Sequence, residues 1–525
     1  MRGKLKEEWP LLVGGVAAIV ILCQHAFADM NIPAGSDWGV YLRAAEHVWH
    51  PERDTTFPDW RTPAYAYLVG ALGESMGYVR SGQLLSSIAA LIMVFAAGLA
   101  GRALADSWAG GLAALVCAAL VPVAHGAHWV NHYPLLGATT GLSLATGILA
   151  SRRPHLLLGL LSGACAGASW ALDLRGFAAV PAAGLLCVIG GLAQQSSWRN
   201  RIGTPLLFLV AVGGLHTAQS ELSKRTATRL MPLEQQVLHQ RELTLDWQTW
   251  EKGPQIDRLK GACADARPKA LDLQDLQGDC AQTMFRVNMQ RLQSAQSIPP
   301  NTTLLLLLLA LCMPAAWGVR SLLAQGVFFG VPVAAIGLGA AWVMYWDRYV
   351  LQFAVPIAVL VPVALSSTGS WLGRRTNREV LGRKLGTLAS AGWLLLAWPL
   401  LGQGLAGAPT LRERIPGEIA AWAAQTIGEE DRLVDCTGLG INQFLLPNKV
   451  PLLDFVNQPT LCTDYLRRPA PERGKTWVIA RHTPDNTPQR GVERSIDAQI
   501  LTELGWQKAT EYHDPPSQIV IWEKH

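Results

Sequence analysis

Long apolar stretches separated by short polar loops constrain the fold of this chain more than any other feature of its sequence. A hydrocarbon core roughly 30 Å thick needs about 20 residues of α-helix to cross it. Eleven stretches meet this requirement, at 10–28, 79–101, 108–125, 132–150, 155–172, 176–193, 202–220, 302–319, 322–344, 349–367 and 385–404. We therefore expect a polytopic α-helical membrane protein with about 11 transmembrane helices.

The composition supports a membrane protein that also exposes polar regions to water. Of the 525 residues, 50% are hydrophobic and only 16% are charged, and the mean hydropathy is +0.20. Such a chain is too apolar for an ordinary soluble protein and too polar to lie entirely in a bilayer. The net charge of +5 is modest, and many Lys and Arg residues fall in short loops, so we interpret them as a topology signal. A nucleic-acid partner is not indicated.

Basic residues in short loops near helix ends mark the cytoplasmic side of a membrane protein. If the N-terminus is cytoplasmic, every inner loop carries such a residue: Arg2, Lys4 and Lys6, then Arg102, Arg152, Arg153, Arg199, Arg201, Arg320, Arg374, Arg375, Arg378, Arg383 and Lys384. We expect four regions, namely a transmembrane module at 1–220 with a first external loop at 29–78, an external helical segment at 221–301, the remaining transmembrane helices at 302–407, and an external α/β domain at 408–525.

The first apolar stretch has two interpretations. A basic leader and the residues Ala26, Phe27 and Ala28 resemble a signal peptide with its cleavage site. Glu7 and Glu8 in the leader, and an apolar run as long as a true span, favour a helix that is kept. We expect the helix to be retained.

The cysteines separate by location. Cys23, Cys117, Cys165, Cys187 and Cys312 lie in apolar spans, where they would pack as small hydrophobic residues. The remaining four lie in the expected external regions, as Cys263 with Cys280 and Cys436 with Cys462. Two disulfides in an oxidising compartment are the hypothesis, and a zinc site is the alternative, although no Cys-x-x-Cys spacing occurs.

The two later external regions have different patterns. Segment 221–301 has apolar residues at helical spacing, which predicts two or three amphipathic helices. The C-terminal region alternates predicted helices at 415–427 and 492–504 with predicted strands at 432–436, 450–456, 475–481 and 518–523. This alternation predicts a small α/β domain.

The first external loop carries the densest polar chemistry in the chain. Between Ser36 and Pro63 it combines five carboxylates with arginines, histidines and aromatic rings next to the membrane. Asp37 is the best placed general base, because a carboxylate near aromatic rings can have a raised pKa. The alternative is an N-cap for the helix that follows, since Ser and Asp are favoured there. The residues alone do not separate the two.

The order of residues resembles the GT-C glycosyltransferases, including bacterial enzymes similar to dolichyl-phosphate-mannose-protein mannosyltransferases and aminoarabinose transferases. The resemblance covers roughly residues 1 to 370 and rests on Asp37, Tyr41 and Ala44 in the first loop, on Trp60, Arg61, Thr62 and Pro63, on Asp173 to Gly176, and on Trp346 to Tyr349. It implies transfer of a sugar, with inversion, from a polyprenyl-phosphate-linked donor to a lipid, glycan or protein acceptor. The implied location is the outer face of the bacterial inner membrane, with the C-terminal domain in the periplasm.

The resemblance also implies roles for individual residues. Asp37 would act as the base, and Arg61, Arg175 and Arg348 would bind the donor phosphate. The substrate pocket would include Tyr41, Asp59, His128, His132 and Asp173. Each arginine taken singly also fits a side chain that snorkels to the interface.

Other functions stay open at this stage. His128 and His132 are four residues apart and would bind a divalent metal if their segment were helical, but substrate hydrogen bonding is favoured and no cofactor is required. An oligosaccharide ligase or polymerase would use a similar lipid-linked glycan. A lipid or glycan transporter is a further alternative, although no internal repeat is visible. The sequence does not identify the sugar, the polyprenyl length or the acceptor.

Overall fold

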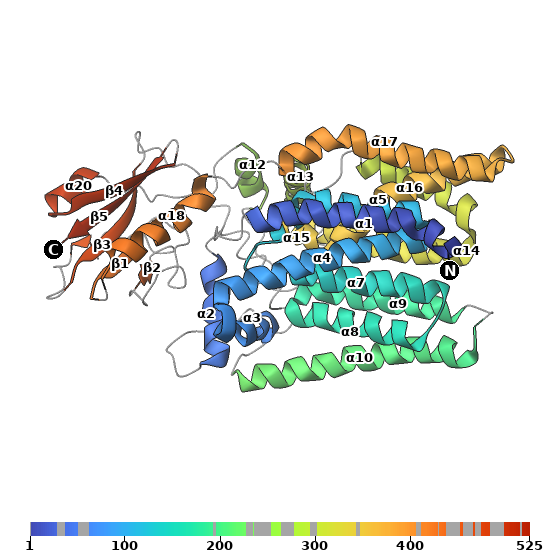
Figure 1. Ribbon diagram of the computed structural model, residues 1–525, viewed down its shortest axis with the longest axis horizontal. Coiled ribbons are helices and arrows are strands. Elements are labelled where there is room, and N and C mark those ends of the chain that lie inside the picture. The colour runs from blue at the N-terminus through green and yellow to red at the C-terminus, as the bar shows by residue number, and fades with distance from the viewer. Residues whose placement is uncertain are drawn as a thin grey trace.

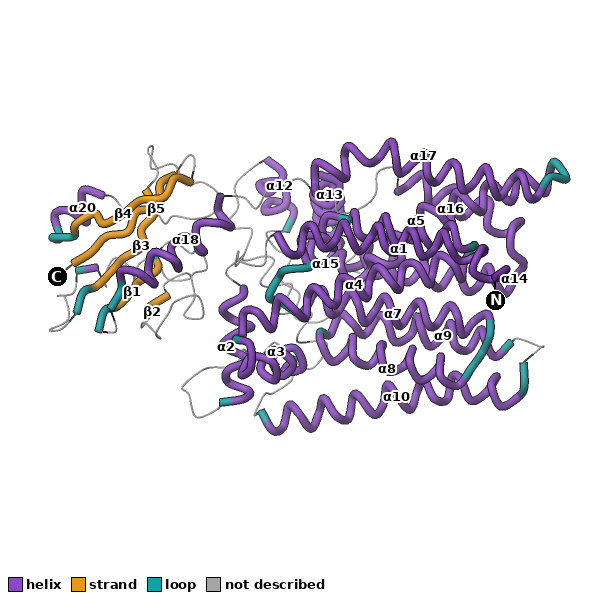
Figure 2. The backbone as a smooth tube through the Cα atoms, in the orientation of Figure 1, coloured by secondary structure: helices purple, strands orange, loops and turns teal. Residues whose placement is uncertain are grey.

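The computed structural model describes residues 2–28, 37–50, 62–192, 196–226, 235, 254–263, 278–294, 302–342, 347–405, 411–428, 430–436, 452–454, 466–467, 474–482, 498–514 and 517–524. Within these residues lie a helical bundle and a β-sheet region, which occupy opposite ends of the long axis of the molecule (Figure 1, Figure 2).

The described residues up to 226 form helices joined by short turns and contain no strand. The elements are α1 (Arg2–Ala28), α2 (Asp37–Trp49), α3 (Pro63–Met76), α4 (Tyr78–Leu104), α5 (Ser107–Ala119), α6 (Val121–Gly126), α7 (Tyr133–Arg152), α8 (Leu156–Leu172), the 3-10 helix η1 (Leu174–Ala178), α9 (Ala179–Gly191) and α10 (Trp198–Arg225).

The second half adds helices and the sheet. Its elements are α12 (Pro254–Ala262), α13 (Asp279–Ser294), α14 (Thr302–Trp342), α15 (Asp347–Val350), the 3-10 helix η3 (Leu351–Phe353), α16 (Ala354–Arg375), α17 (Glu379–Leu405), α18 (Leu411–Thr426), β1 (Arg432–Asp435), β2 (Leu452–Asp454), β3 (Thr476–His482), α20 (Ala498–Glu503), β4 (Gln507–Asp514) and β5 (Ser517–Lys524).

The apolar stretches of the sequence become the helices of the bundle. Among the described residues, six helical segments have the length and hydropathy of a membrane span, within α4, α7, η1 with α9, α10, α14 and η3 with α16. Three shorter apolar segments lie in α1, α5 and α8. The chain is therefore a membrane protein.

Three boundaries differ from those predicted. The stretch at 108–125 is divided at Leu120 into α5 and α6, and Pro122 lies in the first turn of the second helix. The stretch at 176–193 begins in the 3-10 turn η1. The two spans predicted at 302–319 and 322–344 belong to one continuous helix of 41 residues, α14, whose part Leu322–Ala341 has the length and hydropathy of a membrane span.

Close contacts through glycine bring the helix ends of the bundle together. A Cβ atom added to Gly176 in η1 would lie 2.0 Å from the carbonyl oxygen of Ser169 in α8. A Cβ atom added to Gly137 in α7 would lie 2.4 Å from the carbonyl oxygen of Leu351 in η3. The absence of side chains at these two positions lets α8, η1, α7 and η3 meet at one end of the bundle.

Helices α16 and α17 form a similarly close antiparallel pair. A Cβ atom on Gly382 would lie 2.2 Å from the carbonyl oxygen of Gly369, and one on Gly369 would lie 2.3 Å from the carbonyl oxygen of Gly382. The turn between the helices contains Asn377 at φ 54°, a left-handed conformation that asparagine tolerates better than most residues. Backbone approach of this kind is typical of membrane helices that pack through small residues.

The two ends of the bundle carry different polar contacts. At the end that contains the start of α1, Arg102 pairs with Glu8, and Arg152 donates to the carbonyl oxygen of Leu104 at 3.0 Å. The opposite end faces the sheet region and carries α2, α3, α12 and α13 (Figure 1). Arg102 and Arg152, which are among the basic residues predicted for inner loops, therefore lie at the opposite end of the bundle from α2 and α3 (Figure 1).

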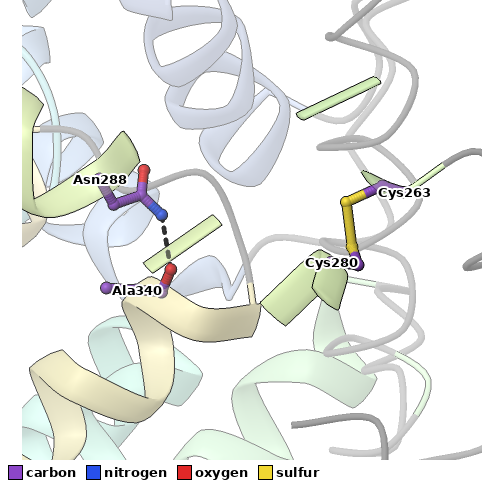
Figure 3. The surroundings of a disulfide bond; sticks show 4 residues. All are labelled: Cys263, Cys280, Asn288 and Ala340. Atoms are coloured by element: carbon purple, nitrogen blue, oxygen red, sulfur yellow. Dashed lines mark hydrogen bonds between the residues drawn. A yellow bond between two sulfur atoms is a disulfide. The ribbon is translucent and has the colours of Figure 1, made fainter. Parts of the chain in front are cut away.

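A disulfide and a hydrogen bond connect the helices at the sheet-facing end (Figure 3). Cys263 at the end of α12 is bonded to Cys280 in α13, as predicted. Asn288 of α13 donates a hydrogen bond of 2.7 Å to the carbonyl oxygen of Ala340 in α14. Cys436 is also disulfide-bonded, and its predicted partner Cys462 lies outside the described residues.

The sheet has the strand order β2-β1-β3-β5-β4, with β2, β1 and β3 parallel and β5 antiparallel to both β3 and β4. Its side chains alternate between two cores, with Leu433 and Ile479 packed with α18, and Val434 and Val478 packed with α20. The strands predicted at 432–436, 450–456, 475–481 and 518–523 correspond to β1, β2, β3 and β5. β4 is absent from the predicted strands because its sequence is mostly polar, as suits an edge strand.

Candidate active site

Helix α2 presents one buried face to the rest of the protein. Tyr41, Leu42, Ala44 and Ala45 are buried and pack with Tyr65, Ala66 and Val69 of α3. The rings of Tyr41 and Tyr65 meet edge to face at a centroid distance of 5.4 Å. This packing follows from the amphipathic spacing of the sequence and places Tyr41 at the end of the bundle.

His132 occupies the position just before α7. The helix begins at Tyr133 and has Pro134 in its first turn, a position where proline suits a helix start. The His132 side chain is only 6% exposed and its ring lies 4.1 Å from the ring of Tyr133. The histidine is therefore held between α2 and the helix junctions of the bundle.

Asp173 closes α8 and opens η1. Its Oδ1 accepts a hydrogen bond of 2.8 Å from the backbone N–H of Arg175, which satisfies a donor at the start of the short helix. The same carboxylate accepts from Arg175 Nε at 2.9 Å and from Arg175 Nη2 at 3.0 Å. This two-point ion pair has the planar geometry that matches a guanidinium to a carboxylate.

A continuous chain of hydrogen bonds joins these elements. His132 Nε2 lies 2.8 Å from Asp173 Oδ2, and His132 Nδ1 lies 2.8 Å from the Tyr41 hydroxyl. An ionised carboxylate only accepts hydrogen bonds, so Nε2 carries a proton. In a neutral ring Nδ1 then accepts from the Tyr41 hydroxyl. The order of donation is Tyr41 to His132 to Asp173.

Aromatic rings surround the Arg175 guanidinium. Its Cζ lies 4.3 Å from the centroid of the Tyr349 ring and 5.1 Å from that of Tyr133, and Nη2 donates to the Tyr133 hydroxyl at 3.0 Å. Gln352 of η3 donates to the Arg175 carbonyl oxygen at 2.6 Å. These contacts fix the cation through cation–π attraction and hydrogen bonds to both its side chain and its backbone.

The cluster keeps its carboxylate charged. Burial by itself would raise the pKa of Asp173, but the adjacent Arg175 charge and the hydrogen bond from His132 hold that pKa well below its usual range. Asp173 lies between α8 and η1 rather than within a span. The site is therefore a paired acid and base that remains ionised at neutral pH.

Comparison with known proteins supports this architecture. No protein-family model and no curated protein sequence matches the chain. Among solved structures, ArnT from Cupriavidus metallidurans bound to undecaprenyl phosphate is similar with a TM-score of 0.50 and 13% identity, over 98% of this chain and 97% of that one.

This chain has the GT-C fold.

Two further structures are similar at lower scores. The apo state of the same ArnT has a TM-score of 0.48 and 14% identity, over 98% of this chain and 97% of that one. The oligosaccharyltransferase of Archaeoglobus fulgidus in its apo form has a TM-score of 0.46 and 13% identity, over 96% of this chain and 73% of that one.

The site in this GT-C fold brings together part of the predicted set. Tyr41, His132, Asp173 and Arg175 form the hydrogen-bonded chain, although they come from sequence positions up to 134 residues apart (175 − 41). Helix α2 begins at Asp37, whose side chain lies outside what the structure describes. The same holds for the Arg348 side chain, and Asp59 and Arg61 lie outside the described residues altogether. Their predicted roles stay predictions.

The structure places both His128 and His132, for which a role in the substrate pocket and a metal site were considered. His128 is buried, with 7% exposure, and its role in the pocket stays a prediction. Among the residues that the structure describes, no three His, Cys, Asp or Glu side chains lie close enough together to hold a metal ion. His132 instead uses both of its ring nitrogens in hydrogen bonds.

The structure adds residues that the sequence pattern did not select for the site. Tyr133, Tyr349 and Gln352 contact Arg175, and Thr62 donates a hydrogen bond of 2.7 Å to the carbonyl oxygen of Leu172, next to Asp173. The sequence gives only weak signals that the two tyrosines belong to the site. Tyr133 directly follows His132, and Tyr349 is the last residue of the motif at 346–349. Gln352 has no sequence signal, because its contact depends on how η3 packs on η1.

Proposed function

We propose that this protein is a membrane glycosyltransferase that moves a sugar from a polyprenyl-phosphate-linked donor to an acceptor at the outer membrane face. The observation that carries the proposal is the Arg175 guanidinium, fixed at the junction of α8 and η1 in a GT-C fold. The structure of the similar ArnT contains bound undecaprenyl phosphate, a polyprenyl phosphate of the kind that the proposed reaction releases.

Arg175 has the chemistry that a lipid phosphate requires. Nε and Nη2 are engaged by Asp173 and Tyr133, and the Nη1 edge has no hydrogen-bond partner among the residues the structure describes. The side chain is one third exposed, at 33%. A phosphate oxygen that approaches Nη1 meets a cation already oriented by two rings, and a guanidinium is charged at every physiological pH.

The other proposed residues adjoin described members of the cluster in the sequence. Arg61 precedes Thr62, which is bonded to the end of α8. Arg348 precedes Tyr349, whose ring lies against Arg175. Asp37 is four residues before Tyr41, at the start of α2. These short separations support Arg61 and Arg348 as further phosphate ligands and Asp37 as the catalytic base.

The proposed reaction is a single displacement with inversion. Asp37 accepts the proton of the acceptor O–H or N–H group while the acceptor atom forms a bond to the anomeric carbon. The bond from that carbon to the lipid phosphate oxygen breaks, and the polyprenyl phosphate leaves with the electron pair. The arginines stabilise the negative charge that develops on the leaving phosphate.

The proposed location is the bacterial inner membrane, with the cluster and the C-terminal α/β domain outside the cytoplasm. The cluster lies at the junctions that precede α7 and η1, while Arg102 and Arg152 lie at the opposite ends of α4 and α7. Basic residues mark the cytoplasmic end. Segment 221–301 is proposed to form an external helical cap, of which the structure describes α12 and α13.

Binding of undecaprenyl phosphate to the purified protein tests the proposal. Ligand that binds only the folded state raises stability by about 2.7 kcal/mol at 100 times its dissociation constant. We expect undecaprenyl phosphate to raise the melting temperature of the wild type, and Arg175→Gln to weaken the effect at least roughly tenfold in ligand concentration. Arg153→Gln, which changes an exposed arginine at the opposite end, should bind as the wild type does.

Two results would count against the proposal. Equal stabilisation of the wild type and Arg175→Gln would remove Arg175 from the phosphate site. A protein that binds undecaprenyl phosphate but produces none of it from extracts of lipid-linked sugars and candidate acceptors would be better explained as a lipid transporter. Mass spectrometry of glycolipids and glycans in a deletion strain then identifies the transferred sugar and its acceptor.

A further inference from the structure

Helix α2 carries both the proposed base and a buried tyrosine that is fixed from outside the helix. The helix begins at Asp37, and Tyr41 follows four residues later. Residues at this spacing lie on the same face of a helix, one turn apart. The position of Tyr41 therefore influences where Asp37 lies, and the inference below rests on the catalytic role proposed for Asp37.

The C-terminal end of α2 is attached to α3. Trp49 Nε1 donates to the carbonyl oxygen of Tyr67 at 3.0 Å, and His50 Nε2 lies 2.7 Å from Glu74 Oε1. Both contacts are three turns away from Asp37. They hold the helix at one end and leave its first turns to be fixed by other groups.

The first turns of α2 are attached to the transmembrane bundle through His132. The Tyr41 hydroxyl bonds to His132 Nδ1, and His132 Nε2 bonds to Asp173, both at 2.8 Å. Asp173 is held in turn by three hydrogen bonds from Arg175. Tyr41 is 4% exposed and the His132 side chain 6%, so water competes little for these bonds.

We infer that Tyr41 and His132 are positioning residues for the transfer reaction. The chain from Tyr41 through His132 to Asp173 fixes the first turns of α2 against the starts of α7 and η1, and thereby sets the place at which Asp37 meets the acceptor. A displacement of about 1 Å at a reacting group costs roughly 100-fold in rate. The connection joins the proposed base to the carboxylate that holds the donor-side arginine.

The Tyr41→Phe variant removes the hydroxyl and keeps the ring that packs against Tyr65. We expect kcat to fall by about 10- to 100-fold, because Asp37 is less well placed. KM for the lipid-linked donor should change by less than about twofold, since Arg175 and its partners are unchanged. Tyr512→Phe is the matched control, because it deletes a tyrosine hydroxyl in β4 of the C-terminal sheet, outside the cluster and outside the contacts of α2. Its kcat should equal that of the wild type.

Substitutions at His132 separate hydrogen bonding from bulk. The amide of His132→Gln offers one acceptor and one donor at a spacing similar to the two ring nitrogens, whereas His132→Leu offers neither. We expect His132→Gln to retain more activity than His132→Leu. The double variant Tyr41→Phe with His132→Leu should lose no more activity than His132→Leu alone, because both changes break the same connection.

Hydrogen exchange supplies a readout that does not depend on activity. In Tyr41→Phe, the amides at 38–45 should exchange about tenfold faster than in the wild type, and those of α4 and α7 should not change. If the wild type transfers no sugar, the proposed function is wrong. Faster exchange confined to α2 in Tyr41→Phe would still support the attachment of α2 through Tyr41.

Three outcomes would overturn the inference. The first is unchanged exchange in α2, which would show that Tyr41 does not hold the helix. The second is faster exchange in α2 with an undiminished kcat. The third is faster exchange throughout the bundle, which would show that the pair maintains the whole fold.

Discussion

His132 Nε2 lies 2.8 Å from Asp173 Oδ2, and this contact joins two junctions that are 41 residues apart in the sequence. Through it, the start of α7 shares one carboxylate with Arg175 at the start of η1. The carboxylate satisfies the histidine, the guanidinium and a backbone N–H at once. A single residue therefore organises the polar contacts of the candidate active site.

Asp173→Asn should destabilise the protein because it removes the charge that balances Arg175. Hydrogen bonds to a charged group contribute about 1.5 to 3 kcal/mol each, so we expect a loss of at least that size in the free energy of unfolding. Thermal unfolding in detergent, followed by circular dichroism, measures the loss. Glu221→Gln is the control, because its ion pair with Lys224 is exposed and should contribute little to stability. Equal effects of the two substitutions would contradict the prediction.

Asp37→Asn distinguishes a catalytic base from a helix cap. Asparagine caps a helix about as well as aspartate does, so a capping role predicts nearly normal activity. A general base contributes roughly 100- to 10,000-fold to the rate, and the variant should lose activity by that factor while melting as the wild type does. Release of polyprenyl phosphate measures the rate, with Asp257→Asn on the exposed side of α12 as control. Full activity in Asp37→Asn would remove the residue from the mechanism.

The C-terminal sheet should lose stability at acid pH through Asp431. Burial opposes its charge, but hydrogen bonds from Trp477 and from the backbone of Lys475 and Gly428 lower its pKa below the usual value. A carboxyl whose pKa is lower when folded contributes stability above the unfolded pKa of about 3.9, and that contribution is lost as pH falls through the folded pKa.

Hydrogen exchange in β1 and β3 tests this contribution in the full-length protein. Asp431→Asn should destabilise these strands by about 1 to 2 kcal/mol at pH 6, with the difference from the wild type shrinking below pH 4. Glu430→Gln, an exposed neighbour, should have no such effect. A difference that is constant over this range of pH would show that the charge of Asp431 is not the cause.

Gly382→Val should separate α17 from α16. The added side chain meets the carbonyl oxygen of Gly369, which belongs to the backbone and has little room to move. Overpacking of this kind costs about 1 to 3 kcal/mol. Gly392→Val in the same helix is the matched control, because a Cβ atom there has no neighbour within 4 Å. Thermal unfolding of the two variants gives the comparison, and equal melting temperatures would contradict the close crossing.

The remaining cysteine pairing is open to a direct test. Peptide mapping without reduction should recover Cys436 linked to Cys462, and alkylation should label neither residue until a reductant is added. A loop of this length contributes roughly 3 kcal/mol in the chain-entropy model, so Cys462→Ser should also lower the stability of the sheet. Recovery of Cys462 as an alkylated free thiol would disprove the pairing.

Local patterns in the sequence predicted much of the fold. The length of the apolar stretches predicted the helices of the bundle, since a membrane span must be both long and hydrophobic. Alternation gave β1, β3 and β5, whose residues face two cores. The span predicted at 322–344 corresponds to Leu322–Ala341, but no loop separates it from the span before it, because hydrogen bonds within a helix tolerate one basic residue such as Arg320. The edge strand β4 was not predicted because it is largely exposed to water, so its sequence is mostly polar and lacks an apolar pattern.

The sequence by itself determined which side chains were available for the site and that Tyr41, His132, Asp173 and Arg175 belonged near the same end of the bundle. Only the tertiary structure decided their partners. Whether Asp173 faces Arg175, whether His132 binds a metal or bridges two residues, and which rings enclose the guanidinium all depend on the rotation and depth of packed helices. Those are set by contacts such as Gly137 against Leu351 and Gln352 against Arg175, which join residues distant in the chain and leave no periodic signal in it.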